Sequence, residues 1–159
     1  MIKKEYITTV TEYSSESELS DIEKELIKES KLSAKKAYTP YSKFNVGASI
    51  LLENNKIISA NNQENIAYPS GMCAERVAIF YANAKYPNIA VKSIVITAFS
   101  NNELVQEPVT PCGSCRQVLL EAELRFNKPI KIIMVGKNKI VTVDNICELL
   151  PLYFFNENI

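Results

Sequence analysis

Three of the four cysteines lie in two short segments, residues 69–76 and 111–117, that also hold two of the four glycines. Each segment lies where a loop is expected to enter a helix, and the N–H groups and dipole of a helix N-terminus lower the pKa of a thiol. Cys112 and Cys115 are three residues apart, so both can point the same way, and Cys73 could supply a third sulfur from another helix. Three thiolates would leave one position of a tetrahedral zinc ion open, which is typical of catalytic zinc sites.

The cysteines allow other interpretations when each motif is taken alone. A single C-x-x-C fits a zinc site, a redox pair of thiols or ordinary core packing, and Cys73 by itself would be assigned to the core. Glu75 favours chemistry, because a carboxylate without a function is costly in so apolar a segment. Its alternative is a surface salt bridge. Cys147, beside Ile146 and Leu150, is predicted to be a core residue, with a fourth, structural zinc ligand as the alternative.

Hydrophobic periodicity predicts the elements that must position these side chains. A helix that is apolar on every side is predicted over 72–84, and it needs a sheet on one side and other subunits on the other. Only Lys137 and Asn138 join the last two strands, which must therefore be antiparallel, and strands that alternate with helices indicate an α/β fold. The predicted order is an N-terminal arm over 1–20, a helix over 21–37, strands over 44–52 and 56–60, the helix over 72–84, a strand over 91–99, a helix over 113–126, strands over 130–136 and 139–143, and a short helix that ends at 150.

The composition excludes several classes of protein. The 159 residues fit a single domain over 1–159, and the absence of histidine excludes Ser-His-Asp and Cys-His mechanisms and imidazole metal ligands. The four glycines are too far apart to form a G-x-G-x-x-G or a P-loop motif. Basic and acidic residues number 18 each, and this zero net charge argues against nucleic acid as a partner. Neither a signal peptide nor a membrane-spanning stretch is visible, so we expect a cytoplasmic protein with no membrane partner.

The pattern Cys-x-Glu at 73–75 followed by Pro-Cys-x-x-Cys at 111–115 is the signature of zinc nucleobase deaminases, here with cysteine in place of a histidine ligand. The chain resembles the small homotetrameric cytidine deaminases from about residue 25 to 154, on this pattern and on residues 41–48, 62–65, 111–119 and 149–151. The resemblance implies a three-layer α/β/α fold with a mixed five-stranded sheet, a homotetramer and a small nucleoside substrate. Antiparallel last strands match the nucleoside enzymes, whereas the enzymes that edit RNA and DNA place a helix there.

The resemblance also implies the activity and the metal site. The family hydrolyses cytidine and 2'-deoxycytidine to uridine and 2'-deoxyuridine, with release of ammonia. By matching position, Cys73, Cys112 and Cys115 would ligate one zinc ion per chain. Zinc-activated hydroxide would attack C4 of the base, with Glu75 as the proton shuttle. Arg76 would donate hydrogen bonds to the sulfurs and offset the net negative charge of zinc with three thiolates.

Substrate contacts are implied by the same matching. Asn62 and Glu64 match the pair that binds the ribose hydroxyls, and Phe44 matches the aromatic that lines the base pocket. Ala74 matches a residue whose backbone contacts the base. Phe154 matches a C-terminal aromatic that reaches a neighbouring subunit's site, although the sequence at 151–155 departs from the family pattern. Two other functions stay open, a blasticidin-S-type antibiotic deaminase and a non-catalytic interaction domain stabilised by zinc.

Overall fold

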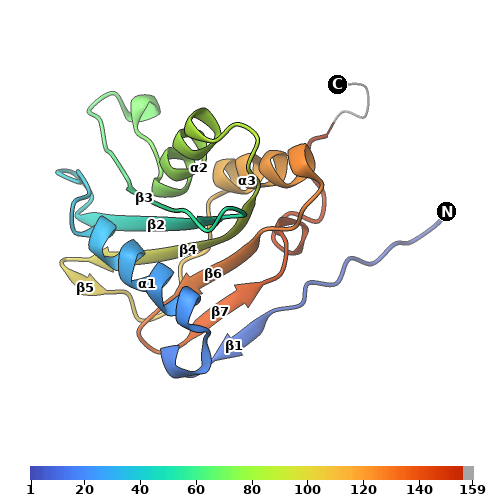
Figure 1. Ribbon diagram of the computed structural model, residues 1–159, viewed down its shortest axis with the longest axis horizontal. Helices are drawn as coiled ribbons and strands as arrows, with labels where there is room; N and C mark the ends of the chain where they lie inside the picture. The colour runs from blue at the N-terminus through green and yellow to red at the C-terminus, as the bar shows by residue number, and fades with distance from the viewer. Residues whose placement is uncertain (156–159) are drawn as a thin grey trace.

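One mixed β-sheet forms the centre of the structure, a computed structural model that describes residues 1–155 (Figure 1). The strand order is β1-β7-β6-β4-β2-β3, with β5 paired to β4, and β4 and β6 are the one parallel pair among the described strands. The strands are β1 (Thr11–Tyr13), β2 (Phe44–Leu52), β3 (Ile57–Asn61), β4 (Val91–Ser100), β5 (Glu103–Leu104), β6 (Lys131–Val135) and β7 (Ile140–Val143). The predicted antiparallel arrangement of the last two strands is confirmed.

Helices cover both faces of the sheet, because both faces are apolar. Along β4, Ile94 and Ile96 pack into the core cluster beneath α2 and α3, whereas Val95 between them packs with residues of α1 on the opposite face. Figure 1 shows α1 (Asp21–Ala34) on one side of the sheet, and α2 (Ala74–Lys85) and α3 (Gly113–Phe126) together on the other. The predicted three-layer α/β/α arrangement is therefore confirmed.

The sheet has seven strands and not the five expected from the sequence. The first addition is β1, in which the N-terminal arm pairs antiparallel with β7 and opposes Thr11 to Thr142. The second is β5, which follows a turn at Asn101 and Asn102, both with positive φ, and pairs with the end of β4. Strands of three and two residues are too short to produce a recognisable alternation. β1 forms on the free edge of β7, and β5 forms on the end of β4 that extends beyond its pairing with β6, where N–H and C=O groups are otherwise unpaired.

Further expectations on the bounds of helices and on Cys147 need correction. The first helix ends at Ala34, before the predicted residue 37, and the second begins at Ala74, so that Cys73 is its N-cap. The last short helix is the 3₁₀ turn η3 (Ile146–Glu148). Cys147 is exposed and not a core residue, because this single turn buries only Ile146 against α3.

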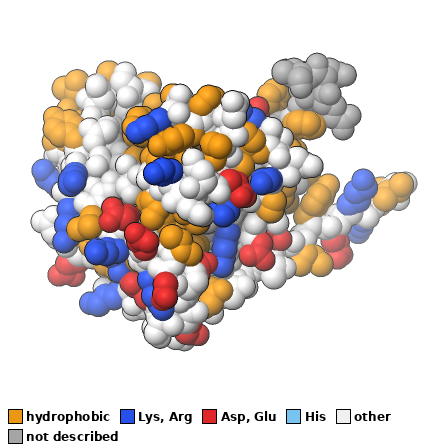
Figure 2. All heavy atoms as spheres, in the orientation of Figure 1, with side chains coloured by type: hydrophobic (Ala, Val, Ile, Leu, Met, Phe, Trp, Pro, Cys, Tyr) orange, Lys and Arg blue, Asp and Glu red, His pale blue; other side chains and the backbone are white. Residues whose placement is uncertain are grey.

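Charged side chains of both signs cover the surface around α1. Figure 2 shows basic and acidic side chains intermixed there, as expected for the solvent side of an amphipathic helix. Within residues 1–155, no helix combines the length and the apolar character that are needed to cross a bilayer.

Candidate active site and metal centre

The three cysteines at the starts of α2 and α3 come together in the structure. Cys73 is the N-cap of α2, Cys112 is the N-cap of α3, and Cys115 lies in the first turn of α3. Their sulfur atoms all lie within 4.8 Å of one another, with 3.9 Å between Cys73 and Cys112 and 3.5 Å between Cys112 and Cys115. The contact between α2 and α3 thus joins Cys73 to a pair of cysteines that begins 39 residues further along the chain.

These sulfur positions fit a zinc ion. Tetrahedral zinc with Zn–S bonds of about 2.3 Å separates its sulfurs by about 3.8 Å. Hydrogen bonds from Cys115 and Arg76 lower the pKa of Cys73 to about 5, whereas the pKa of Cys115 is raised by its hydrogen bond to Cys73 and by burial. One thiolate therefore opposes the ionisation of the next. A divalent cation removes this opposition and allows all three sulfurs to be thiolates.

Arg76 lies beside the cluster, one turn further along α2. Its Nη2 donates a hydrogen bond to the Cys73 sulfur at 3.7 Å, and this bond raises the pKa of the guanidinium. Nε of the same group is buried and has no hydrogen-bond partner within residues 1–155. Arg76 thus places a positive charge next to a centre that would carry three negative sulfurs. Its Nε–H group remains available as a further hydrogen-bond donor.

Glu75 is a buried carboxyl group in the first turn of α2. It is 5% exposed and forms no ion pair within the described part of the chain, so the alternative of a surface salt bridge does not apply. Burial raises its pKa, and the negative charge of Cys73 adds to that rise. A carboxyl group in such surroundings takes up a proton more readily than an exposed glutamate does.

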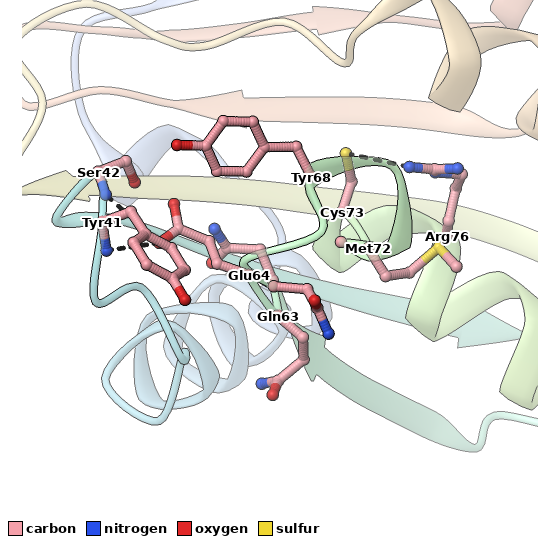
Figure 3. Close-up of a pocket in the computed structure, with 11 residues that line it drawn as sticks. Tyr41, Ser42, Gln63, Glu64, Tyr68, Met72, Cys73 and Arg76 are labelled. Carbon is pink, nitrogen blue, oxygen red and sulfur yellow. Dashed lines mark hydrogen bonds between the residues drawn. The ribbon is translucent and has the colours of Figure 1, made fainter.

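A cavity of about 590 Å³ opens beside Cys73 and Arg76, a size that suits a small organic molecule. Figure 3 shows Tyr41 and Tyr68 at the end of the cavity away from Arg76, and their rings meet edge to face with centroids 6.3 Å apart. Glu64 lies between these tyrosines and Met72. The cavity is lined by Tyr41, Ser42, Asn62, Gln63, Glu64, Asn65, Tyr68, Gly71, Met72, Cys73 and Arg76.

The two polar residues predicted to bind ribose both line this cavity. The Asn62 side chain accepts a hydrogen bond from Val46 N–H at 2.8 Å and donates one to the Phe44 carbonyl at 3.0 Å, which fixes the amide plane. One carboxylate oxygen of Glu64, Oε2, accepts the N–H groups of Tyr41 and Ser42. Hydrogen bonds from the Ser42 side chain and from these N–H groups lower the pKa of Glu64, so it is a carboxylate with Oε1 left for a ligand.

The other predicted substrate contacts are placed differently. Phe44 begins β2 and is half-buried, but it is not among the residues that line the cavity. Ala74 is fully buried directly after Cys73. Phe154 is 82% exposed, and its carbonyl accepts a hydrogen bond from the Gln117 side chain at 2.9 Å. Phe154 therefore faces away from the core of its own chain.

Sequence reasoning did not single out the two tyrosines of the cavity. Tyr41 belongs to a stretch used only for the family resemblance, and Tyr68 lies between the Asn-x-Glu pattern and Cys73 in a loop of ordinary composition. The signal that could have found them is their position, because Tyr41 lies three residues before Phe44 and Tyr68 lies four residues after Glu64. Cys147 lies outside the sulfur cluster, which contradicts a site closed by all four cysteines.

A three-layer α/β/α fold that gathers three thiols and a buried glutamate at two adjacent helix starts defines the class of zinc-binding deaminases. The family model described as "Cytidine and deoxycytidylate deaminase zinc-binding region" matches residues 20–128, and the chain belongs to this family. The resemblance found in the sequence is therefore confirmed. The arm before residue 20 lies outside the match.

Curated relatives and solved structures agree with this assignment. A cytidine deaminase of Sporosarcina psychrophila is 37% identical over 87% of this chain and 95% of its own, and one of Halalkalibacterium halodurans is 36% identical over 84% and 94%. The crystal structure of cytidine deaminase from Burkholderia pseudomallei superimposes with a TM-score of 0.70 at 31% identity, and covers 82% of this chain and 98% of that one.

Proposed function

We propose that this protein is a zinc-dependent cytidine deaminase, which hydrolyses cytidine and 2'-deoxycytidine to the corresponding uridines and ammonia in the cytoplasm. The observation that carries the proposal is the cluster of Cys73, Cys112 and Cys115 beside the buried Glu75, next to a cavity of nucleoside size. Membership of the deaminase family and the curated cytidine deaminases at 36% and 37% identity support the same substrate class.

The proposed chemistry divides the work between metal and protein. Cys73, Cys112 and Cys115 would hold zinc as thiolates, and the metal would supply a Lewis acid that lowers the pKa of water toward neutrality. Glu75 would accept a proton from the attacking water and deliver it to N3 of the cytosine ring as the water oxygen bonds to C4, and would then transfer the proton of the new C4 hydroxyl to the departing amino group. Water supplies the oxygen of the product and two protons, of which one stays on N3 and the other completes ammonia, so no covalent intermediate with the protein is required. Arg76 would stabilise the negative sulfurs by its positive charge and by the hydrogen bond that it donates to Cys73.

Substrate binding is proposed for the residues of the cavity wall. Glu64 would accept hydrogen bonds from the ribose hydroxyls through Oε1, since Oε2 is occupied by the backbone of residues 41 and 42. Asn62 would contribute its second amide hydrogen. Phe44 would contact the base, for which its side chain must turn toward the cavity, and the backbone at Ala74 would bind the edge of the base.

We propose a homotetramer in which Phe154 reaches a neighbouring subunit's site. Its ring is exposed, and so are Phe80 and Tyr81 on the side of α2 away from the sheet. Burial of such aromatic side chains between subunits lowers the free energy of association. Light scattering is expected to give four times the mass of one chain, and a monomeric mass would refute the assembly.

The enzymatic proposal is tested by the loss of the ultraviolet absorbance of cytidine, with zinc content measured on the same samples. Glu75→Gln keeps the size of the side chain but cannot carry the proton, so the rate is expected to fall by about 10²–10⁴-fold with zinc unchanged. Cys147→Ser is the matched control, and its rate and zinc content should equal those of the wild type, because Cys147 lies outside the cluster. A zinc-loaded wild type that leaves both nucleosides intact would show the proposal to be wrong.

A further inference from the structure

Arg116 makes an unusual set of contacts directly after the buried ligand candidate Cys115. Its Nε donates a hydrogen bond to the Pro111 carbonyl at 2.8 Å, Nη1 donates to the Leu149 carbonyl at 2.7 Å, and Nη2 donates to Thr110 Oγ1 at 3.2 Å. All three acceptors are neutral oxygens, and Arg116 forms no ion pair within residues 1–155. The guanidinium therefore joins backbone segments and does not neutralise a carboxylate.

Both peptide groups that flank Cys112 are held by Arg116. The side chain binds the carbonyl before Cys112, which belongs to Pro111, and the backbone N–H of Arg116 donates to the carbonyl of Cys112 itself at 2.9 Å. Because peptide groups are planar, and those of the described residues are trans, fixing these two carbonyls fixes φ and ψ of Cys112. The direction of the Cys112 side chain and of its N–H follows from these two angles.

Of the three cysteines, Cys112 is the one whose side chain is held least by burial. Cys115 is buried within α3 and Cys73 is half-buried, whereas Cys112 is exposed and is the last residue of a loop. An exposed loop residue moves more freely than a buried helical one, and a metal ligand must stay within a few tenths of an ångström of its place.

The same side chain holds the C-terminal segment. Leu149 follows η3, and the chain continues from it to Phe154, whose carbonyl is bound by Gln117, the residue next to Arg116. Arg116 and Gln117, near the start of α3, thus anchor the loop that carries Cys112 and the segment that carries Phe154.

We propose that Arg116 is a positioning residue, which holds Cys112 in place for metal binding and ties the ligand loop to the C-terminal segment. The inference rests on the zinc site of the proposed function. Arg116 acts through the backbone of its neighbours and does not touch the reacting atoms.

The test compares Arg116→Lys with Arg125→Lys in the full, zinc-loaded chain. Lysine keeps the positive charge and the aliphatic stem, but its single ammonium cannot serve three acceptors arranged around a planar fork. Arg125 is the matched control, because it lies in the last turn of the same helix and also donates to a backbone carbonyl, that of Pro87. Zinc release to a colorimetric chelator is measured below the unfolding temperature of every variant.

Arg116→Lys is expected to release zinc about 10–100-fold faster than the wild type, and Arg125→Lys within about twofold of the wild-type rate. A purely structural role would lower the stability of the metal-free and zinc-loaded forms equally and leave the release rate unchanged. That result would overturn the inference while the zinc site stands. A wild-type chain that binds no zinc would instead overturn the proposed function.

A measurement on the wild type applies even if Arg116→Lys does not fold. The chain has three arginines, so their Nε–H groups give three assignable signals in a nitrogen–proton NMR spectrum. Removal of zinc by a chelator is expected to shift the signal of Arg116 and to leave that of Arg125 in place. An Arg116 signal that does not respond to zinc would overturn the inference.

Discussion

Glu123 offers a test of the packing that supports the site, because it is a buried carboxyl group with a structural task. It is 7% exposed near the end of α3, and its Oε1 accepts the N–H of Ile130 at 2.7 Å and the N–H of Ile146 at 2.8 Å. These bonds join α3 to the start of β6 and to η3. Both isoleucines are fully buried, so their N–H groups have no access to bulk water.

Glu123→Ala removes the acceptor of two buried N–H groups. Each unsatisfied group costs about 1–3 kcal/mol, so the free energy of unfolding is expected to fall by about 2–6 kcal/mol. Glu123→Gln keeps a carbonyl oxygen in the same place and should lose far less. The difference between these two uncharged variants measures the loss of the acceptor together with the loss of side-chain volume.

The wild type and Glu123→Gln are also expected to respond differently to pH. Burial raises the pKa of Glu123 in the folded state above its unfolded value. The carboxyl group therefore contributes its full stability below the unfolded pKa, and this contribution is lost as the pH rises through the folded pKa. Since glutamine does not titrate, the stability of Glu123→Gln relative to the wild type should increase from about pH 4 to pH 7.

Urea unfolding followed by circular dichroism at several pH values measures these differences, with zinc-loaded protein in every sample. The reasoning would be refuted by an alanine variant within about 0.5 kcal/mol of the wild type, which is the usual range of a neutral surface change. It would equally be refuted by a glutamine variant whose relative stability falls as the pH rises.

Two glycines give opposite expectations for the same substitution, measured in the same unfolding assay. A Cβ at Gly47 would lie 2.0 Å from the Ser30 carbonyl oxygen, so Gly47→Ala must push α1 off β2 and is expected to cost about 3 kcal/mol or more. A Cβ at Gly113 would meet no atom within 4 Å, so Gly113→Ala should stabilise the chain by about 0.5–1 kcal/mol, and destabilisation there would contradict this interpretation of α3.

The sequence alone determined the parts of the site that depend on neighbours along the chain. Cys112 and Cys115 share one side of α3 because three residues make almost one helical turn, and the loops before them end where the helix begins. The burial of Glu75 followed from the apolar residues around it. The antiparallel last strands followed from the two residues that join them.

The tertiary structure decided every contact between segments that are far apart in the sequence. Cys73 meets Cys112 across 39 residues because α2 and α3 pack side by side on one face of the sheet, and no local pattern encodes that neighbourhood. The pairing of the N-terminal arm with β7 has the same origin, as does the bond from Arg116 to Leu149. Local periodicity specifies which face of a helix or strand is apolar, whereas its neighbours are chosen only when the sheet order brings those faces together.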